Sequence, residues 1–145
     1  MLSMLPGTIL ILEEDLQLQW ILKTFLEGKG FSIITLDALE EVQAVISKQR
    51  VPVIITTEQW LKNSHLLETI RQIKRSLPDI YILMTTYRMM EEKDYEEFFL
   101  SGVDDILEKP FALNNITVLL KKRLKIGLEG TKEGPSLSNE MGLVT

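Results

Sequence analysis

Short apolar runs that alternate with segments of helical periodicity constrain the fold of this chain more than any other feature. The hydrophobicity of these runs is continuous, which is typical of strands buried on both faces of a parallel sheet. The predicted strands are Thr8 to Leu12, Phe31 to Thr35, Pro52 to Thr56, Ile80 to Met84 and Asp105 to Leu107.

The segments between these runs have the spacing of amphipathic helices. In the first, the apolar residues recur on one face before Gly28 and Gly30; they are Leu18, Ile21, Leu22, Phe25 and Leu26. Trp20, also at helical spacing, is expected to be partly buried. The other predicted helices are Ala38 to Ser47, Leu66 to Leu77, Glu91 to Leu100 and Leu113 to Ile126. Strands alternating with helices imply right-handed crossovers. We therefore predict an α/β fold, a three-layer doubly wound five-stranded parallel sheet.

The length and composition favour a single domain. A chain of 145 residues with 45% hydrophobic content can form one well-filled core. We assign residues 1–7 to an N-terminal extension, 8–126 to the domain, and 127–145, rich in polar residues and glycine, to a flexible tail or linker. The N-terminus has neither a basic lead-in nor a long apolar stretch, so we expect no signal peptide, no membrane span and a cytoplasmic location.

The charge of the chain argues against nucleic-acid binding. The net charge is -5 and the pI is about 5.0, whereas a phosphate backbone calls for clustered cations. The basic cluster Lys121 to Arg123 fits the last turn of a helix, where cations suit the helix dipole. The sequence contains no cysteine, which excludes disulfides, thiol catalysis and cysteine-based zinc sites.

Polar side chains lie within two residues of the ends of four of the predicted strands. Glu13 and Glu14 follow the first strand, Glu58 the third, Thr86 the fourth and Lys109 the fifth. In doubly wound sheets, ligands bind beyond the carboxyl ends of the strands, close to the point where the strand order reverses. We therefore expect these residues to form one site.

Two stretches of the chain resemble the receiver domain of bacterial two-component response regulators. They are Ile9-Leu10-Ile11-Leu12-Glu13-Glu14-Asp15 and Ser101-Gly102-Val103-Asp104-Asp105-Ile106-Leu107-Glu108-Lys109-Pro110-Phe111, and the resemblance extends over Thr8 to Ile126. It implies a flavodoxin-like receiver fold and a signalling module of a phosphorelay rather than an enzyme. It also implies a histidine kinase or another protein as partner.

The resemblance assigns a role to each polar residue of the expected site. Glu13 and Glu14 match the acidic pair that holds a magnesium ion, together with a backbone carbonyl that here belongs to Trp60. Glu58 matches the aspartate that accepts the phosphoryl group. Thr86 and Lys109 match the hydroxyl and the lysine that bind its oxygens.

The chain departs from the family pattern at the acceptor, the following loop and the switch. Glu58 carries its carboxylate about 1.5 Å further from the backbone than an aspartate would. The loop 59–65 contains neither proline nor glycine, and Ile106 replaces the aromatic residue that changes rotamer on activation. Tyr87 takes a position that is normally small and could screen the pocket. We interpret the chain as a degenerate receiver, or pseudo-receiver.

Three glutamates and one lysine give the expected site a charge of about -2 when all are ionised. A weakly bound Mg²⁺ would neutralise this negative charge, because acidic oxygens suit this hard cation. The second way to reduce the charge needs no cofactor: Glu58 pairs directly with Lys109, and one of Glu13 and Glu14 takes a raised pKa.

Three classes of function remain open to the sequence. The first is protein–protein interaction or homodimerisation through the fourth helix, fifth strand and fifth helix, with Tyr95, Phe98 and Lys121 to Arg123 as candidate contacts. The second is a phosphorylation-competent receiver that binds Mg²⁺ and accepts phosphate from a histidine kinase, on Glu58 or Thr57. A flavodoxin-like cofactor-binding protein is disfavoured, because the acidic run after the first strand would repel a phosphate.

Overall fold

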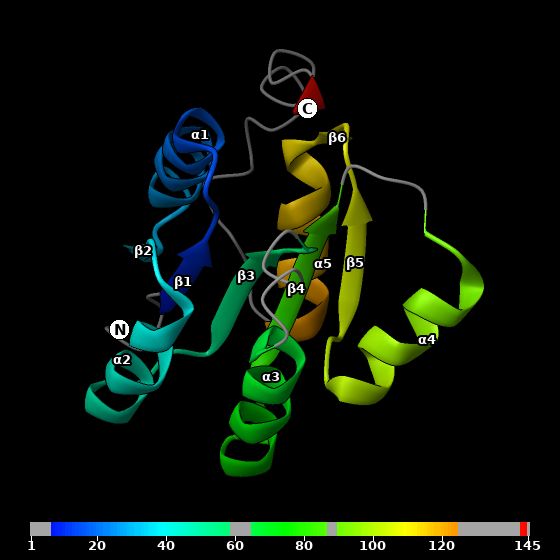
Figure 1. Ribbon diagram of the computed structural model, residues 1–145. Coiled ribbons are helices and arrows are strands. Elements are labelled where there is room, and N and C mark those ends of the chain that lie inside the picture. The colour runs from blue at the N-terminus through cyan, green and yellow to red at the C-terminus, as the bar shows by residue number, and fades with distance from the viewer. Residues whose placement is uncertain (1–6, 59–64, 87–89, 125–142, 145) are drawn as a thin grey trace.

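A five-stranded parallel sheet forms the centre of the molecule, as the sequence predicted. The computed structural model describes residues 7–58, 65–86, 90–124 and 143–144. The strand order is β2-β1-β3-β4-β5, and each neighbouring pair is parallel (Figure 1). The strands are β1 (Thr8–Leu12), β2 (Ser32–Leu36), β3 (Val53–Thr57), β4 (Tyr81–Thr86) and β5 (Asp105–Glu108).

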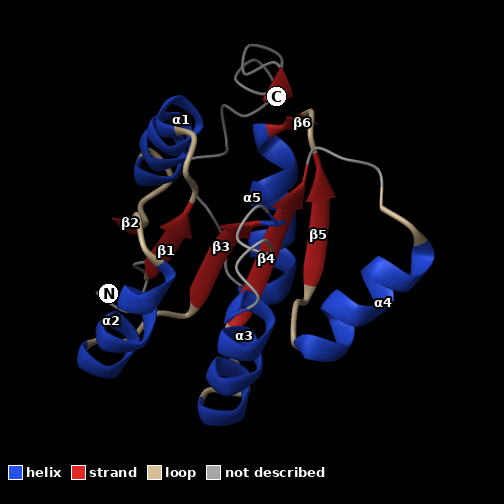
Figure 2. Cartoon of the chain, viewed as in Figure 1, coloured by secondary structure: helices blue, strands red, loops and turns tan. Residues whose placement is uncertain are grey.

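Helices follow the strands in alternation, which gives three layers (Figure 2). They are α1 (Leu16–Glu27), a 3-10 turn η2 (Leu39–Glu41), α2 (Val42–Lys48), α3 (His65–Ser76), α4 (Glu92–Ser101) and α5 (Leu113–Leu124). Of the described residues, none belongs to a helix long and apolar enough to cross a membrane.

Two short strands were not predicted. Strand β6 (Phe111–Ala112) directly precedes α5 and pairs antiparallel with β7 (Leu143–Val144), which lies in the segment predicted as a tail or linker. The predicted second helix, Ala38 to Ser47, is divided into η2 and α2.

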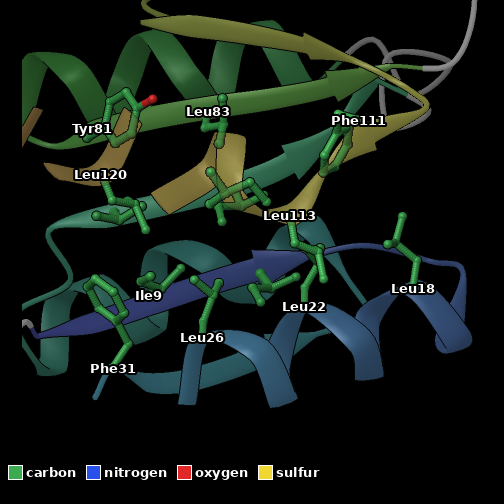
Figure 3. Packing of buried hydrophobic residues seen from close by; sticks show 14 residues of the cluster. Ile9, Leu18, Leu22, Leu26, Phe31, Tyr81, Leu83, Phe111, Leu113 and Leu120 are labelled. Atoms are coloured by element: carbon green, nitrogen blue, oxygen red, sulfur yellow. The ribbon is translucent and has the colours of Figure 1, made fainter. Parts of the chain in front are cut away.

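The two faces of the sheet carry separate apolar clusters. On one face, α1 and α5 pack against β1, β3 and β4; Figure 3 shows Leu18, Leu22 and Leu26 of α1 together with Ile9 and Leu120. On the other face, α2, α3 and α4 cover the sheet through Val42, Ile70 and Phe98, among others. Because helices cover both faces, every residue of β3 and β4 is buried, which explains their continuous hydrophobicity.

Two side chains lie differently from the sequence prediction. Trp20 was expected to be partly buried but is 65% exposed, because the buried stripe of α1 is formed by Leu18, Leu22 and Leu26. Phe98 was predicted to contact a partner protein but is 3% exposed and belongs to the core under α4. The apolar face predicted for the first helix is confirmed at Leu18, Leu22 and Leu26, whereas the sequence did not show that Phe98 of α4 faces the sheet.

The turns at both ends of the sheet have specific local causes. The carboxylate of Asp15 caps α1 by accepting the N–H groups of Gln17 and Leu18, at 3.0 and 3.2 Å. This cap begins the helix directly after Glu13 and Glu14. At the opposite edge, α4 ends at Gly102, whose φ of +124° suits glycine.

Candidate functional site

The strand order brings the predicted site residues to one edge of the sheet. Strands β1 and β3 are neighbours, and β2 lies on the other side of β1, so the order reverses between β1 and β3. Glu13 and Glu58 directly follow these two strands, Thr86 ends β4 and Lys109 follows β5. Glu13, Glu58 and Thr86 are all buried.

A buried ion pair joins the residue that follows β1 to the residue that follows β5. The Nζ atom of Lys109 lies 3.4 Å from Oε1 of Glu13, and the two side chains are only 4% and 3% exposed. The direct pair of Glu58 with Lys109 that the sequence analysis offered stays a prediction. In the structure, Lys109 forms an ion pair with Glu13 of the acidic pair.

The backbone on both sides holds this ion pair in place. The other carboxylate oxygen of Glu13, Oε2, accepts the N–H of Asp15 at 3.0 Å, and the carbonyl of Glu13 accepts the side-chain amide of Gln19 at 3.0 Å. The N–H of Lys109 donates to the carbonyl of Thr86 at 2.6 Å. The positions of Glu13 and Lys109 are therefore fixed by several contacts.

The two members of the acidic pair have different surroundings. Glu13 is buried, whereas Glu14, the next residue, is exposed to solvent. Glu58 is 6% exposed at the end of β3. A buried glutamate therefore stands at the strand end where the family resemblance places the acceptor.

The fit of a magnesium ion can be tested on these residues. In the ranges described, no group of three or more His, Cys, Asp or Glu side chains is placed to hold a metal ion. Glu13 points one oxygen at Lys109 and the other at the N–H of Asp15. The described arrangement therefore does not fit a magnesium site. The carbonyl of Trp60, the predicted third ligand, lies outside the described residues.

The predicted switch and screen positions have different outcomes. Ile106 is half-buried on β5 and packs against the cluster under α2, α3 and α4. Tyr87 lies outside the described residues.

A contact that the sequence did not predict joins α4 to this edge of the sheet: the hydroxyl of Tyr95 donates to the carboxylate of Glu108, the neighbour of Lys109. This hydrogen bond raises the pKa of Tyr95.

A second polar cluster, at the opposite edge of the sheet, was missed by the sequence reasoning. Asp105 accepts the hydroxyl of Tyr81 at 2.8 Å and two guanidinium N–H groups of Arg123, at 2.9 and 3.0 Å. Asp104 pairs with Lys74 at 2.9 Å. The adjacent acids at the start of β5 were the available signal. This cluster attaches α3 and α5 to the sheet.

The ionisation of this second cluster predicts a pH dependence of stability. Burial alone would raise the pKa of Asp105, but hydrogen bonds from Arg123 and Tyr81 outweigh it and hold this pKa below its ordinary value of 3.8. Because the folded-state pKa is lowered, the stabilisation is present above about pH 4 and is lost as the pH falls through the folded-state pKa.

We therefore expect Asp105→Asn to lower the free energy of unfolding by about 1 kcal/mol at pH 6, a modest value because Arg123 is 39% exposed. Urea denaturation of both proteins at pH 6 and at pH 2.5 measures the difference. A difference that persists unchanged at pH 2.5 would contradict the assignment of the stabilisation to the ionised carboxylate.

Known proteins similar to this chain are response regulators. The sequence profile of the response regulator receiver domain matches residues 9–121. The DNA-binding transcriptional regulator NtrC of Salmonella typhimurium is 23% identical over 119 residues, which are 81% of this chain and 25% of that protein. The chain thus spans about a quarter of that relative.

Solved structures show the same fold. A response regulator from Thermotoga maritima superposes with a TM-score of 0.71 at 19% identity, over 82% of this chain and 98% of that one. The beryllofluoride-activated NtrC4 receiver domain dimer gives 0.72 at 22% identity, over 81% and 96%. A two-component response regulator from Clostridium difficile gives 0.70 at 26% identity, over 82% and 96%.

Proposed function

Since this chain belongs to the response regulator receiver domain family, we propose that it is a degenerate receiver, which signals through protein contacts and accepts no phosphoryl group. It is a signalling module of a two-component system. As in the sequence analysis, we assign it to the cytoplasm and give it no enzymatic and no nucleic-acid-binding activity of its own.

The observation that carries the proposal is the buried Glu58 at the acceptor position. Phosphoryl transfer depends on placing the attacking oxygen in line with the phosphorus, and a displacement of about 1 Å can cost about a hundredfold in rate. Glutamate extends the carboxylate by one methylene, and the residues at this position are buried, with Glu58 6% exposed and Thr86 0% exposed. The carboxylate of Glu58 is therefore expected to lie beyond the position that an aspartate carboxylate would take.

Thr57, the other acceptor that the sequence left open, is also a poor candidate. Its side chain is fully buried in β3, so a phosphodonor in solution has no direct access to its hydroxyl. Transfer to this oxygen would require the end of the strand to open.

The proposed contact surface is the face formed by α4, β5 and α5, with a protein partner, a histidine kinase or a second copy of this chain. Tyr95 and Lys121 are half-buried and Lys122 is exposed, so all three retain accessible surface. Phe98 is removed from the candidate contacts by its burial. Arg123 forms an ion pair with Asp105, so a partner protein would contact this ion pair rather than an isolated arginine.

Intact-mass analysis after incubation with acetyl phosphate and MgCl₂ tests the proposal without a cognate kinase. We expect no phosphoryl adduct on the unmodified protein. We expect Glu58→Asp to gain one if the length of the side chain alone is at fault, because the shorter side chain returns the carboxylate to the distance that aspartate has in the family. An inert Glu58→Asp protein would instead implicate the loop 59–65, Tyr87 or the absence of bound Mg²⁺.

The outcomes separate the two receiver hypotheses. An adduct on the unmodified protein would show a phosphorylation-competent receiver and overturn the proposal. As a matched control, Glu68→Asp makes the same change on the exposed surface of α3 and is expected to leave the protein without an adduct.

A further inference from the structure

We propose that Lys109 serves as the built-in cation of this pocket, so that the unmodified protein binds no Mg²⁺ at Glu13. The inference rests on the proposed function, because it concerns how the same pocket is neutralised.

Both carboxylate oxygens of Glu13 already have positively polarised neighbours. Oε1 lies 3.4 Å from the ammonium of Lys109, and Oε2 accepts the N–H of Asp15 at 3.0 Å. A metal ion on Oε1 would lie beside the ammonium of Lys109, and a metal ion on Oε2 would share that oxygen with the N–H of Asp15. Placing a divalent cation next to an ammonium in a site that excludes water is electrostatically costly.

Burial makes the ion pair difficult to separate. The side chains of Glu13 and Lys109 are 3% and 4% exposed, so neither charge can be compensated by water after the pair is broken. The backbone of Lys109 is bound to Thr86, and the carbonyl of Glu13 is bound to Gln19. A rearrangement that freed Glu13 for a metal would therefore disturb several contacts together.

The second acid of the pair does not supply an alternative site. Glu14 is exposed to solvent while Glu13 is buried, so the two carboxylates do not present one common oxygen cluster. Magnesium is bound through a near-octahedral arrangement of oxygens and gives up its water reluctantly. Lys109 thus satisfies the buried carboxylate, and Glu14 remains hydrated.

Thermal unfolding in MgCl₂ tests this inference on the unmodified protein. We expect 10 mM MgCl₂ to shift the Tm by less than about 1 °C relative to NaCl of equal ionic strength, since an empty cation site is not available. A site with a Kd of about 1 mM would raise the ratio of folded to unfolded protein about elevenfold at that concentration. A saturable stabilisation specific to MgCl₂ would overturn the inference.

Substitution of Lys109 is expected to make the Tm depend on MgCl₂. In Lys109→Met, Glu13 loses its cation, and we expect a Tm that rises with MgCl₂ and saturates. Lys93→Met makes the same charge change at a side chain that is 79% exposed, and it should show no such response. If Lys109→Met folds and remains as insensitive to MgCl₂ as the unmodified protein, Lys109 is not what keeps the metal out.

A paramagnetic measurement does not depend on the variant folding. We expect Mn²⁺ added to ¹⁵N-labelled unmodified protein to leave the amide signals of Glu13 and Asp15 as sharp as that of Ile82, at the other end of the sheet. Selective broadening at Glu13 and Asp15 would overturn the inference. Metal binding without a phosphoryl adduct would refute this inference alone, whereas an adduct on the unmodified protein would refute the proposed function.

Discussion

Replacing Ile116 with alanine is expected to lower the free energy of unfolding by about 3–5 kcal/mol, in the upper part of the range for deleting a large aliphatic side chain from a core. Ile116 is fully buried, and with Leu113 and Leu120 it attaches α5 to the sheet. The truncation leaves a cavity between the helix and β1, β3 and β4. Interior packing is too dense for the neighbouring side chains to fill that space.

Val118 supplies the matched control, because it lies on the same helix and is 55% exposed. We expect Val118→Ala to change the free energy of unfolding by less than about 0.5 kcal/mol. Urea denaturation followed by far-UV circular dichroism measures both variants. Equal losses for the two would mean that α5 is not packed against the sheet in the way described.

The second large effect is expected at the end of α4, where Gly102→Ala should cost about 2–4 kcal/mol. Gly102 has a φ of +124°, a conformation that residues with a side chain rarely adopt. A methyl group there would lie 2.7 Å from Cγ of Lys74 and 3.2 Å from Cγ2 of Ile70. The lysine has little freedom to move, because its ammonium is bound to Ile80 and Asp104.

Gly28 provides the comparison, since it also ends a helix. Its φ is -65°, and an added Cβ would meet only backbone oxygens, at 3.3 and 3.5 Å. We therefore expect Gly28→Ala to change the free energy of unfolding by less than about 0.5 kcal/mol. Chemical denaturation of the two variants side by side measures the difference. A similar loss at both positions would contradict the conformational explanation.

A substitution at Gly102 is also expected to affect the polar cluster around Asp104 and Asp105 at the start of β5. Lys74 touches the position where the methyl group would be, and the same lysine holds Asp104 at the start of β5. Strain at Gly102 is therefore expected to loosen the contact between α3 and β5 as well. Gly102→Ala and Asp104→Ala should then be non-additive, which a double-mutant cycle measures.

The sequence by itself determined the layered sheet and the edge at which the site lies. Continuous apolar runs such as Ile9 to Leu12 can be satisfied only where helices cover both faces of a sheet, so their pattern predicted the parallel topology. Parallel strands share one carboxyl edge. Residues that follow different strands, such as Glu13, Glu58 and Lys109, must therefore lie along that one edge, and the strand order decides which of them come close.

Tertiary structure alone decided which of these residues pair. Glu13 and Lys109 are 96 positions apart, and no local rule predicts that they form an ion pair. The pair is held by the N–H of Asp15, which donates to Glu13, and by the backbone contact between Lys109 and Thr86, while Glu14 lies in solvent. Burial then makes this one pairing stable, because an ammonium and a carboxylate enclosed together cannot be replaced separately by water.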